Sequence, residues 1–230
     1  METHPMDNAV ALVQAYLRLH GYFTVTEYPV IEALRGGGYR SATDLDVLAV
    51  RFAHARHIAP RRGAATGDDD QSGADPALAV PLDRPDMIIA EVKEGAAVLN
   101  AAATDAAVLR TALVRFGCCE SDGVGALVTT LLHRGHAILP NGHGVRMIAF
   151  GSTVGAANGA YHRVALGSVV DYLQRYVRTH FHALRTMSPK DPAFAFLLTL
   201  EKALRGRRSD GMPPMHGTDA EIISGFADSV

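Results

Sequence analysis

The sequence has little cysteine and no tryptophan. Its two cysteines, Cys118 and Cys119, are adjacent in a chain of 230 residues. Neighbouring cysteines cannot build a disulfide framework, and no paired Cys/His spacing predicts a zinc site. We therefore expect both residues to be reduced thiols in a cytoplasmic protein.

Long hydrophobic runs are missing too. No stretch reaches the roughly 18 apolar residues that a membrane helix needs, and no basic segment followed by an apolar one opens the chain. Hydrophobic residues make up 48% and charged residues 20%, which is enough apolar mass for a sizeable core. We expect no membrane partner, and one domain with appendages.

A strong charge of either sign is also lacking. The formal net charge is -2 at pH 7, so the whole chain gives no basic signal for nucleic acid. A local basic groove can be offset by acidic surface elsewhere. The charge balance therefore neither favours nor excludes a DNA partner.

Two short apolar segments carry acidic residues where a purely structural strand would not place them. They are residues 42–52 (ATDLDVLAVRF) and 87–94 (MIIAEVKE). Both are rich in β-branched and aliphatic residues and have the length of a strand. They predict two neighbouring strands with charged groups at their ends.

The charged residues of these segments suggest one chemistry. Alternation along a strand places Glu91 and Lys93 on one side, and Asp44 and Asp46 on a shared face. Carboxylates beside an ammonium group form a site for a hard cation next to a proton donor or acceptor. Such a site suits metal-assisted cleavage of phosphodiester bonds.

Asp46, a long gap and then Glu91-Val92-Lys93 resemble the P-D…(D/E)-x-K nuclease superfamily, which has the restriction-endonuclease-like fold. The run from Asp44 to Ala49 looks like the acidic strand of resolvase-like members, and residues 8–25 resemble their first helix and strand. The resemblance covers residues 8–151. It departs in that no proline precedes Asp46, and Pro85-Asp86 cannot replace that motif because it lies only five residues before Glu91.

The resemblance implies roles for individual residues. Asp46 and Glu91 would bind Mg²⁺, with Mn²⁺ as a substitute, and Glu27 from the first strand would complete the metal site. Lys93 would orient or deprotonate the attacking water, or stabilise charge on the phosphorane. Asp44 is an alternative that would contact these ligands and not the metal ion itself.

A glycine run between the first two predicted strands is flanked by arginines. Gly36-Gly37-Gly38 lacks the spacing of a phosphate-binding loop and predicts a hairpin turn. Arg35 and Arg40 on either side of it are candidates for contact with a DNA backbone.

The remaining pattern predicts the order of elements and the domains. Helices are expected over residues 7–20, from Thr104 to 116, from Ser121 to 132, and over 168–186 and 194–204. A further core strand is expected over 145–150. We predict an α/β fold with a restriction-endonuclease-like core, its mixed central sheet flanked by helices, over residues 1–151. A mobile hairpin insertion would span 53–84, a C-terminal helical extension packed on the core would span 152–205, and a loose tail 206–230.

The function that this predicts is a Mg²⁺-dependent endodeoxyribonuclease. The alternative is a nuclease-like protein without catalysis that binds nucleic acid or regulates a partner. Cleavage of both strands would favour a homodimer. The sequence leaves open whether the substrate is DNA or RNA, and whether it is a duplex, a junction or a single strand.

Overall fold

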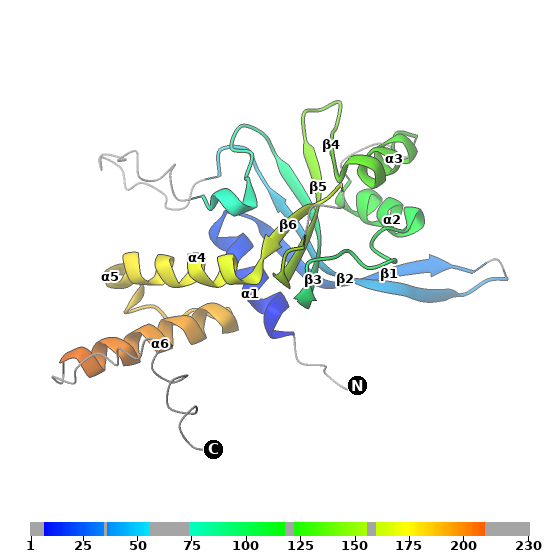
Figure 1. The fold of residues 1–230 in the computed structure, drawn as a ribbon. Coiled ribbons are helices and arrows are strands. Elements are labelled where there is room, and N and C mark those ends of the chain that lie inside the picture. Colours follow the sequence, from blue (N-terminus) through cyan, green and yellow to red (C-terminus); the bar gives the residue numbers. More distant parts are fainter. Residues whose placement is uncertain (1–6, 35, 56–73, 118–121, 156–159, 210–230) are drawn as a thin grey trace, which may run out of the picture.

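The protein is described by a computed structural model that covers residues 7–34, 36–55, 74–117, 122–155 and 160–209. A mixed six-stranded sheet lies between helices on both of its faces (Figure 1). The predicted α/β class, with a mixed central sheet and flanking helices, is confirmed. No helix among the described residues has both the length and the apolar character needed to cross a membrane.

The sheet has the strand order β1-β2-β3-β5-β4, and β6 also pairs with β5. The first three strands are antiparallel, whereas β5 runs parallel to β3. The outer edge of β5 pairs with β4 near its start and with β6 near its end. The bounds are Phe23–Ala33 (β1), Tyr39–Arg51 (β2), Asp86–Ala96 (β3), His136–Ile138 (β4), Gly144–Thr153 (β5) and His162–Ala165 (β6).

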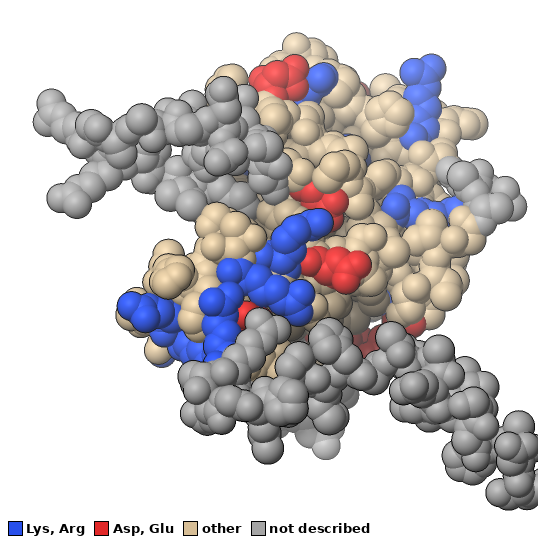
Figure 2. Space-filling view, turned by 60° about the vertical axis from the view of Figure 1, so that its left-hand side comes forward, with Lys and Arg blue, Asp and Glu red and all other residues tan. Residues whose placement is uncertain are grey.

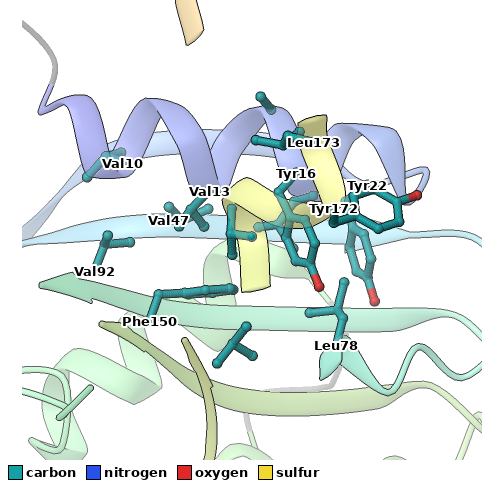
Figure 3. Packing of buried hydrophobic residues seen from close by; sticks show 14 of the residues in the cluster. Val10, Val13, Tyr16, Tyr22, Val47, Leu78, Val92, Phe150, Tyr172 and Leu173 are labelled. Carbon is teal, nitrogen blue, oxygen red and sulfur yellow. The ribbon is translucent and has the colours of Figure 1, made fainter. Parts of the chain in front are cut away.

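One face of the sheet is covered by α1 (Asn8–Leu19) and α4 (Leu166–Thr179). The last helix, α6 (Pro192–Ser209), packs on α1 and α4, and the short α5 (Phe181–Leu184) lies between α4 and α6 in the chain. Asp7 caps α1, because its carboxylate accepts a hydrogen bond of 2.8 Å from the Ala9 N–H. Tyr16 of α1, Tyr172 of α4 and Phe150 of β5 meet in the core beneath these helices (Figure 3). We call this the α1-side core.

The opposite face is covered by α2 (Ala106–Phe116) and α3 (Val124–Arg134), which pack on the α2-side core. Asp105 caps α2 through the N–H groups of Ala107 and Val108, so the predicted Thr104 cap is wrong. Thr104 is unsuitable because its hydroxyl donates to carbonyls of the preceding turn. The predicted cap of α3, Ser121, lies outside the described residues, and the N-cap position is taken by Gly123.

The C-terminal segment shares its sheet and its core with the rest of the chain. The predicted boundary at residue 151 falls inside β5, and β6 extends the same sheet. The predicted helix over 168–186 is observed as α4 and α5, and α6 extends to Ser209. Apolar side chains of α4 and α6, such as Val169 and Leu198, join those of α1 in the α1-side core. Residues 210–230 of the predicted tail lie outside the described residues.

The predicted mobile insertion over 53–84 is corrected at its C-terminal end. Residues 56–73 lie outside the described residues, but residues 74–84 belong to the packed body. Leu78 is fully buried in the α1-side core (Figure 3). Asp75 accepts a 2.9 Å hydrogen bond from the Tyr16 hydroxyl, and its N–H donates to His20 Nε2 at 3.0 Å. The pattern of apolar residues in the sequence did not predict that residues 74–84 are packed, because hydrogen bonds of polar groups hold much of this segment in place.

Asp86, at the start of β3, is held by a buried ion pair. Arg146 of β5 donates to its Oδ2 at 2.7 Å, and the Tyr22 hydroxyl donates to the same oxygen. Arg146 also donates to the Leu78 carbonyl at 2.9 Å, which ties residues 74–84 to the sheet. Burial of the Arg146 guanidinium by itself lowers its pKa, but the hydrogen bond and charge of Asp86 outweigh burial and raise it. Asp86 is therefore structural.

We predict that Asp86→Asn lowers the free energy of unfolding by about 3–5 kcal/mol, because Arg146 would stay buried without a compensating charge. Urea unfolding measures this loss. Asp83→Asn is the matched control, since Asp83 pairs with Arg84 at the exposed surface, and should change stability by about 0.5 kcal/mol or less. Equal effects of the two substitutions would contradict the structural role of Asp86.

Candidate active site

The site forms where β2 leaves β3. The ladder between these strands runs from Arg51↔Asp86 to Val47↔Ala90 and ends there. Just beyond the end of this ladder, the backbone N–H of Val92 in β3 donates a hydrogen bond to Asp46 Oδ2 at 2.7 Å. A side-chain carboxylate of β2 thus takes the place of a backbone carbonyl, and this fixes Asp46 beside the end of β3.

The alternation of β2 is interrupted at Asp46. Leu45 lies in the α2-side core and Val47 in the α1-side core, although two residues apart should share a face. Glu27 lies in β1 between the paired positions Thr26↔Val47 and Tyr28↔Leu45, and it has a φ of 51°, which is uncommon for a residue other than glycine. The two strands therefore change face together, and Asp46 projects at the point of change.

Glu91 and Lys93 project from β3 toward the α2 side, as their alternation predicted. Lys93 Nζ lies 3.1 Å from Glu91 Oε2 and 3.7 Å from Asp46 Oδ2. The Glu91 side chain is fully buried, that of Asp46 is 24% exposed and that of Lys93 is 38% exposed. The structure thus brings together the three predicted catalytic residues, with one ammonium group bridging two carboxylates.

Asn100, which the sequence did not predict, completes the surroundings of Glu91. Its Nδ2 donates to Glu91 Oε2 at 2.7 Å, while its Oδ1 accepts from the Ala103 N–H at 2.6 Å. Asn100 lies in the turn between β3 and α2. Its only sequence signal is that it is the single amide in an alanine-rich stretch after the Glu91-Val92-Lys93 triplet.

Glu91 and Lys93 each shift the pKa of the other. Burial raises the pKa of Glu91 and the charge of Asp46 raises it further, against the opposing effect of Lys93. Burial by itself lowers the pKa of Lys93, but the hydrogen bond and charge of Glu91, followed by the charge of Asp46, raise it above its ordinary value. Lys93 is therefore an ammonium ion at neutral pH.

The other predicted site residues lie apart from this group. Glu27, which the resemblance suggested as a further metal ligand, is exposed and has a positive φ. No three His, Cys, Asp or Glu residues within the described ranges form a group that could hold a metal ion, so neither Glu27 nor Asp44 adds a third carboxylate in this structure. Asp44 is exposed, two residues before the change of face.

The predicted substrate-binding arginines belong to the β1–β2 hairpin, which projects from the body (Figure 1). Arg40 is exposed near the start of β2, six residues from Asp46, which is about 20 Å along an extended strand. Arg35 lies outside the described residues. Any contact of Arg40 with DNA would therefore lie well away from Asp46.

The donor set fits Mg²⁺, although it contains only two carboxylates. Mg²⁺ is usually bound through one or two carboxylates and keeps several waters. Glu91 Oε1 is buried and has no hydrogen-bond partner in the structure. A buried oxygen of this kind requires an explanation, and a bound cation would compensate it.

Comparisons with known proteins do not identify a family for this chain. No family model, curated protein or solved structure matches it. The resemblance to the P-D…(D/E)-x-K superfamily therefore stays a prediction, and the function has to be argued from the site itself.

We predict that Glu91→Gln stabilises the metal-free protein at neutral and alkaline pH. The raised pKa means that the folded state holds the Glu91 proton more tightly than the unfolded chain does. Wild-type stability should therefore fall as pH rises from 4.5, the ordinary value for glutamate, through the raised pKa. The neutral amide removes this loss, so the advantage of the variant should grow with pH and disappear below pH 4.5.

Urea unfolding in EDTA at pH 4 and pH 8 measures this difference. Glu94→Gln is the matched control, because Glu94 lies on the same strand but is exposed, and it should change stability by about 0.5 kcal/mol or less. A Glu91→Gln variant that is less stable than wild type at pH 8 would show that the pair with Lys93 outweighs the burial of Glu91.

Proposed function

We propose that this protein is a Mg²⁺-dependent nuclease that hydrolyses phosphodiester bonds in DNA. The observation that carries the proposal is the convergence of Asp46, Glu91 and Lys93 at the end of the β2–β3 ladder. The order of one helix, three antiparallel strands, helices and a parallel strand also agrees with the core of the P-D…(D/E)-x-K superfamily.

Each residue of the site has a role that follows from its surroundings. Asp46 and Glu91 would hold Mg²⁺ through their carboxylate oxygens. Mg²⁺, when bound, supplies a Lewis acid for the phosphate and a water that loses its proton more easily. The Val92 N–H orients Asp46, and Asn100 orients Glu91.

The ionisation of Lys93 selects among its candidate roles. Because its pKa is raised, Lys93 holds its proton at neutral pH and is poorly suited to deprotonate water. An ammonium group at 38% exposure can instead donate hydrogen bonds to a phosphate oxygen and stabilise the negative charge that develops on the phosphorane. We assign this electrostatic role to Lys93.

A basic surface supports binding of DNA to this protein, although the net charge is -2 and the surface lies on the α1 side of the sheet, opposite the side toward which Glu91 and Lys93 project. Lys and Arg side chains gather over the region of α4–α6 (Figure 2). One carboxylate, Glu201, pairs with both Arg178 and Arg205 there, at 3.5 Å and 2.7 Å. Exposed cations of these helices and their connections are Arg175, Arg178, Arg185, Lys190 and Lys202. A phosphate backbone could neutralise such a surface.

The second candidate function is nucleic-acid binding or regulation without catalysis. One observation favours it, namely that Lys93 already bridges the two carboxylates and compensates one of their two negative charges. In that case the three residues would form a stable ion cluster that does not admit a metal ion.

We predict that Asp46→Asn and Lys93→Ala each reduce cleavage of supercoiled plasmid by about a hundredfold or more. Asn is chosen at position 46 because its carbonyl oxygen can still accept the Val92 N–H. Cleavage is measured in Mg²⁺, in Mn²⁺ and in EDTA, which should abolish it. Glu94→Gln, at an exposed neighbouring position, should cleave like wild type.

The same assay separates the two candidate functions. A wild-type protein that binds labelled duplex DNA but does not cleave it in either metal would support the binding function. Cleavage that persists in both variants would show that the activity comes from another site, and the assignment would fail.

A further inference from the structure

Asn100 is held in one orientation by two opposite partners. The Glu91 carboxylate can only accept a hydrogen bond and the Ala103 N–H can only donate one. The amide must therefore place Nδ2 toward Glu91 and Oδ1 toward Ala103. The Ala103 contact, at 2.6 Å, ties the amide to the turn before α2, whereas the Thr104 hydroxyl reaches only the Asn100 backbone carbonyl, at 3.2 Å.

Glu91 Oε2 receives both of the donors that reach the carboxylate. Asn100 donates from 2.7 Å and Lys93 from 3.1 Å, while Oε1 is buried without a partner. The two donors differ in freedom, because the Lys93 side chain is long and 38% exposed whereas the Asn100 amide is tied to a turn. Only Asn100 can hold Glu91 when Lys93 moves.

We propose that Asn100 is a positioning residue of the metal site. By holding Oε2 it keeps Glu91 in one rotamer, with Oε1 left over for the cation, and it allows Lys93 to leave the carboxylates for the phosphate. The inference rests on the proposed function, because it assigns a residue to the same metal site. It adds a residue that neither the spacing of the site nor the resemblance indicated.

The physical reason is preorganisation. A buried carboxylate with one fixed oxygen presents the other to a cation without first losing rotamer freedom. Hydrogen-bond partners behind a metal ligand commonly contribute 10–100-fold to metal affinity. Loss of Asn100 should weaken the metal site even though the residue itself does not touch the metal.

Metal affinity, measured separately from cleavage, tests this role. Mn²⁺ binding to the full-length protein is titrated by calorimetry or by the electron paramagnetic resonance of free Mn²⁺, without DNA. Asn100→Ala should weaken Mn²⁺ binding by about tenfold or more. Thr104→Val is the matched control, because it removes the Thr104 hydroxyl from the same turn without touching Glu91, and it should leave the affinity within about twofold.

A second variant separates positioning from folding. Asn100→Ser can still accept the Ala103 N–H within the turn, but its hydroxyl is too short to replace the amide at Glu91. It should lose Mn²⁺ affinity as Asn100→Ala does, with a smaller fall in Tm in EDTA. If Asn100 acts through Glu91, then Asn100→Ala should have no further effect on Mn²⁺ affinity in a Glu91→Gln background.

The outcomes distinguish this inference from the proposed function. A wild-type protein that binds no Mn²⁺ overturns both. Mn²⁺ binding by wild type that is unchanged in Asn100→Ala and Asn100→Ser overturns the positioning role alone. Equal losses in Thr104→Val and Asn100→Ala would show that the turn as a whole, and not the amide, supports the site.

Discussion

The early end of the β2–β3 ladder is the constraint on which the site depends. Because pairing stops after Val47↔Ala90, the Val92 N–H faces β2 without a backbone partner, and Asp46 supplies a carboxylate oxygen to it. A backbone group at the edge of a core needs such an acceptor. The same hydrogen bond fixes Asp46 close to Lys93. One contact thus supplies the Val92 N–H with an acceptor and sets the geometry of the site.

This constraint also explains why β1 is irregular. Asp46 must project where β2 changes from one core to the other, and the paired strand has to change face with it. Glu27 does so with a positive φ, between the residues of β1 that pair with Val47 and Leu45. An uncommon backbone conformation beside a group of charged residues is a frequent feature of functional sites.

The sequence allowed the three charged residues to be predicted but not their supports. Glu91 and Lys93 follow from simple alternation, and Asp46 from an acidic residue in a neighbouring apolar strand. Glu27 was proposed from the resemblance, and its positive φ could not be predicted because such a conformation in a non-glycine residue leaves no trace in a hydrophobic pattern. Aspartate and threonine are both residue types that cap helices, and the choice between Asp105 and Thr104 depends on the position of the turn in the structure. Asn100 could not be found because one amide in a loop carries no periodicity.

The two buried carboxylates of β3, Asp86 and Glu91, differ in how completely they are hydrogen-bonded. Asp86 accepts hydrogen bonds from Arg146 and Tyr22, and Arg146 approaches both of its oxygens. Glu91, five residues later and equally buried, has donors only at Oε2. A protein that needed Glu91 only for stability would lose little by replacing it with an apolar residue, since incompletely paired buried charges are costly. The unpartnered oxygen, beside an ammonium group with a freer side chain, is the point at which a cation would supply the missing partner, as the proposed function requires.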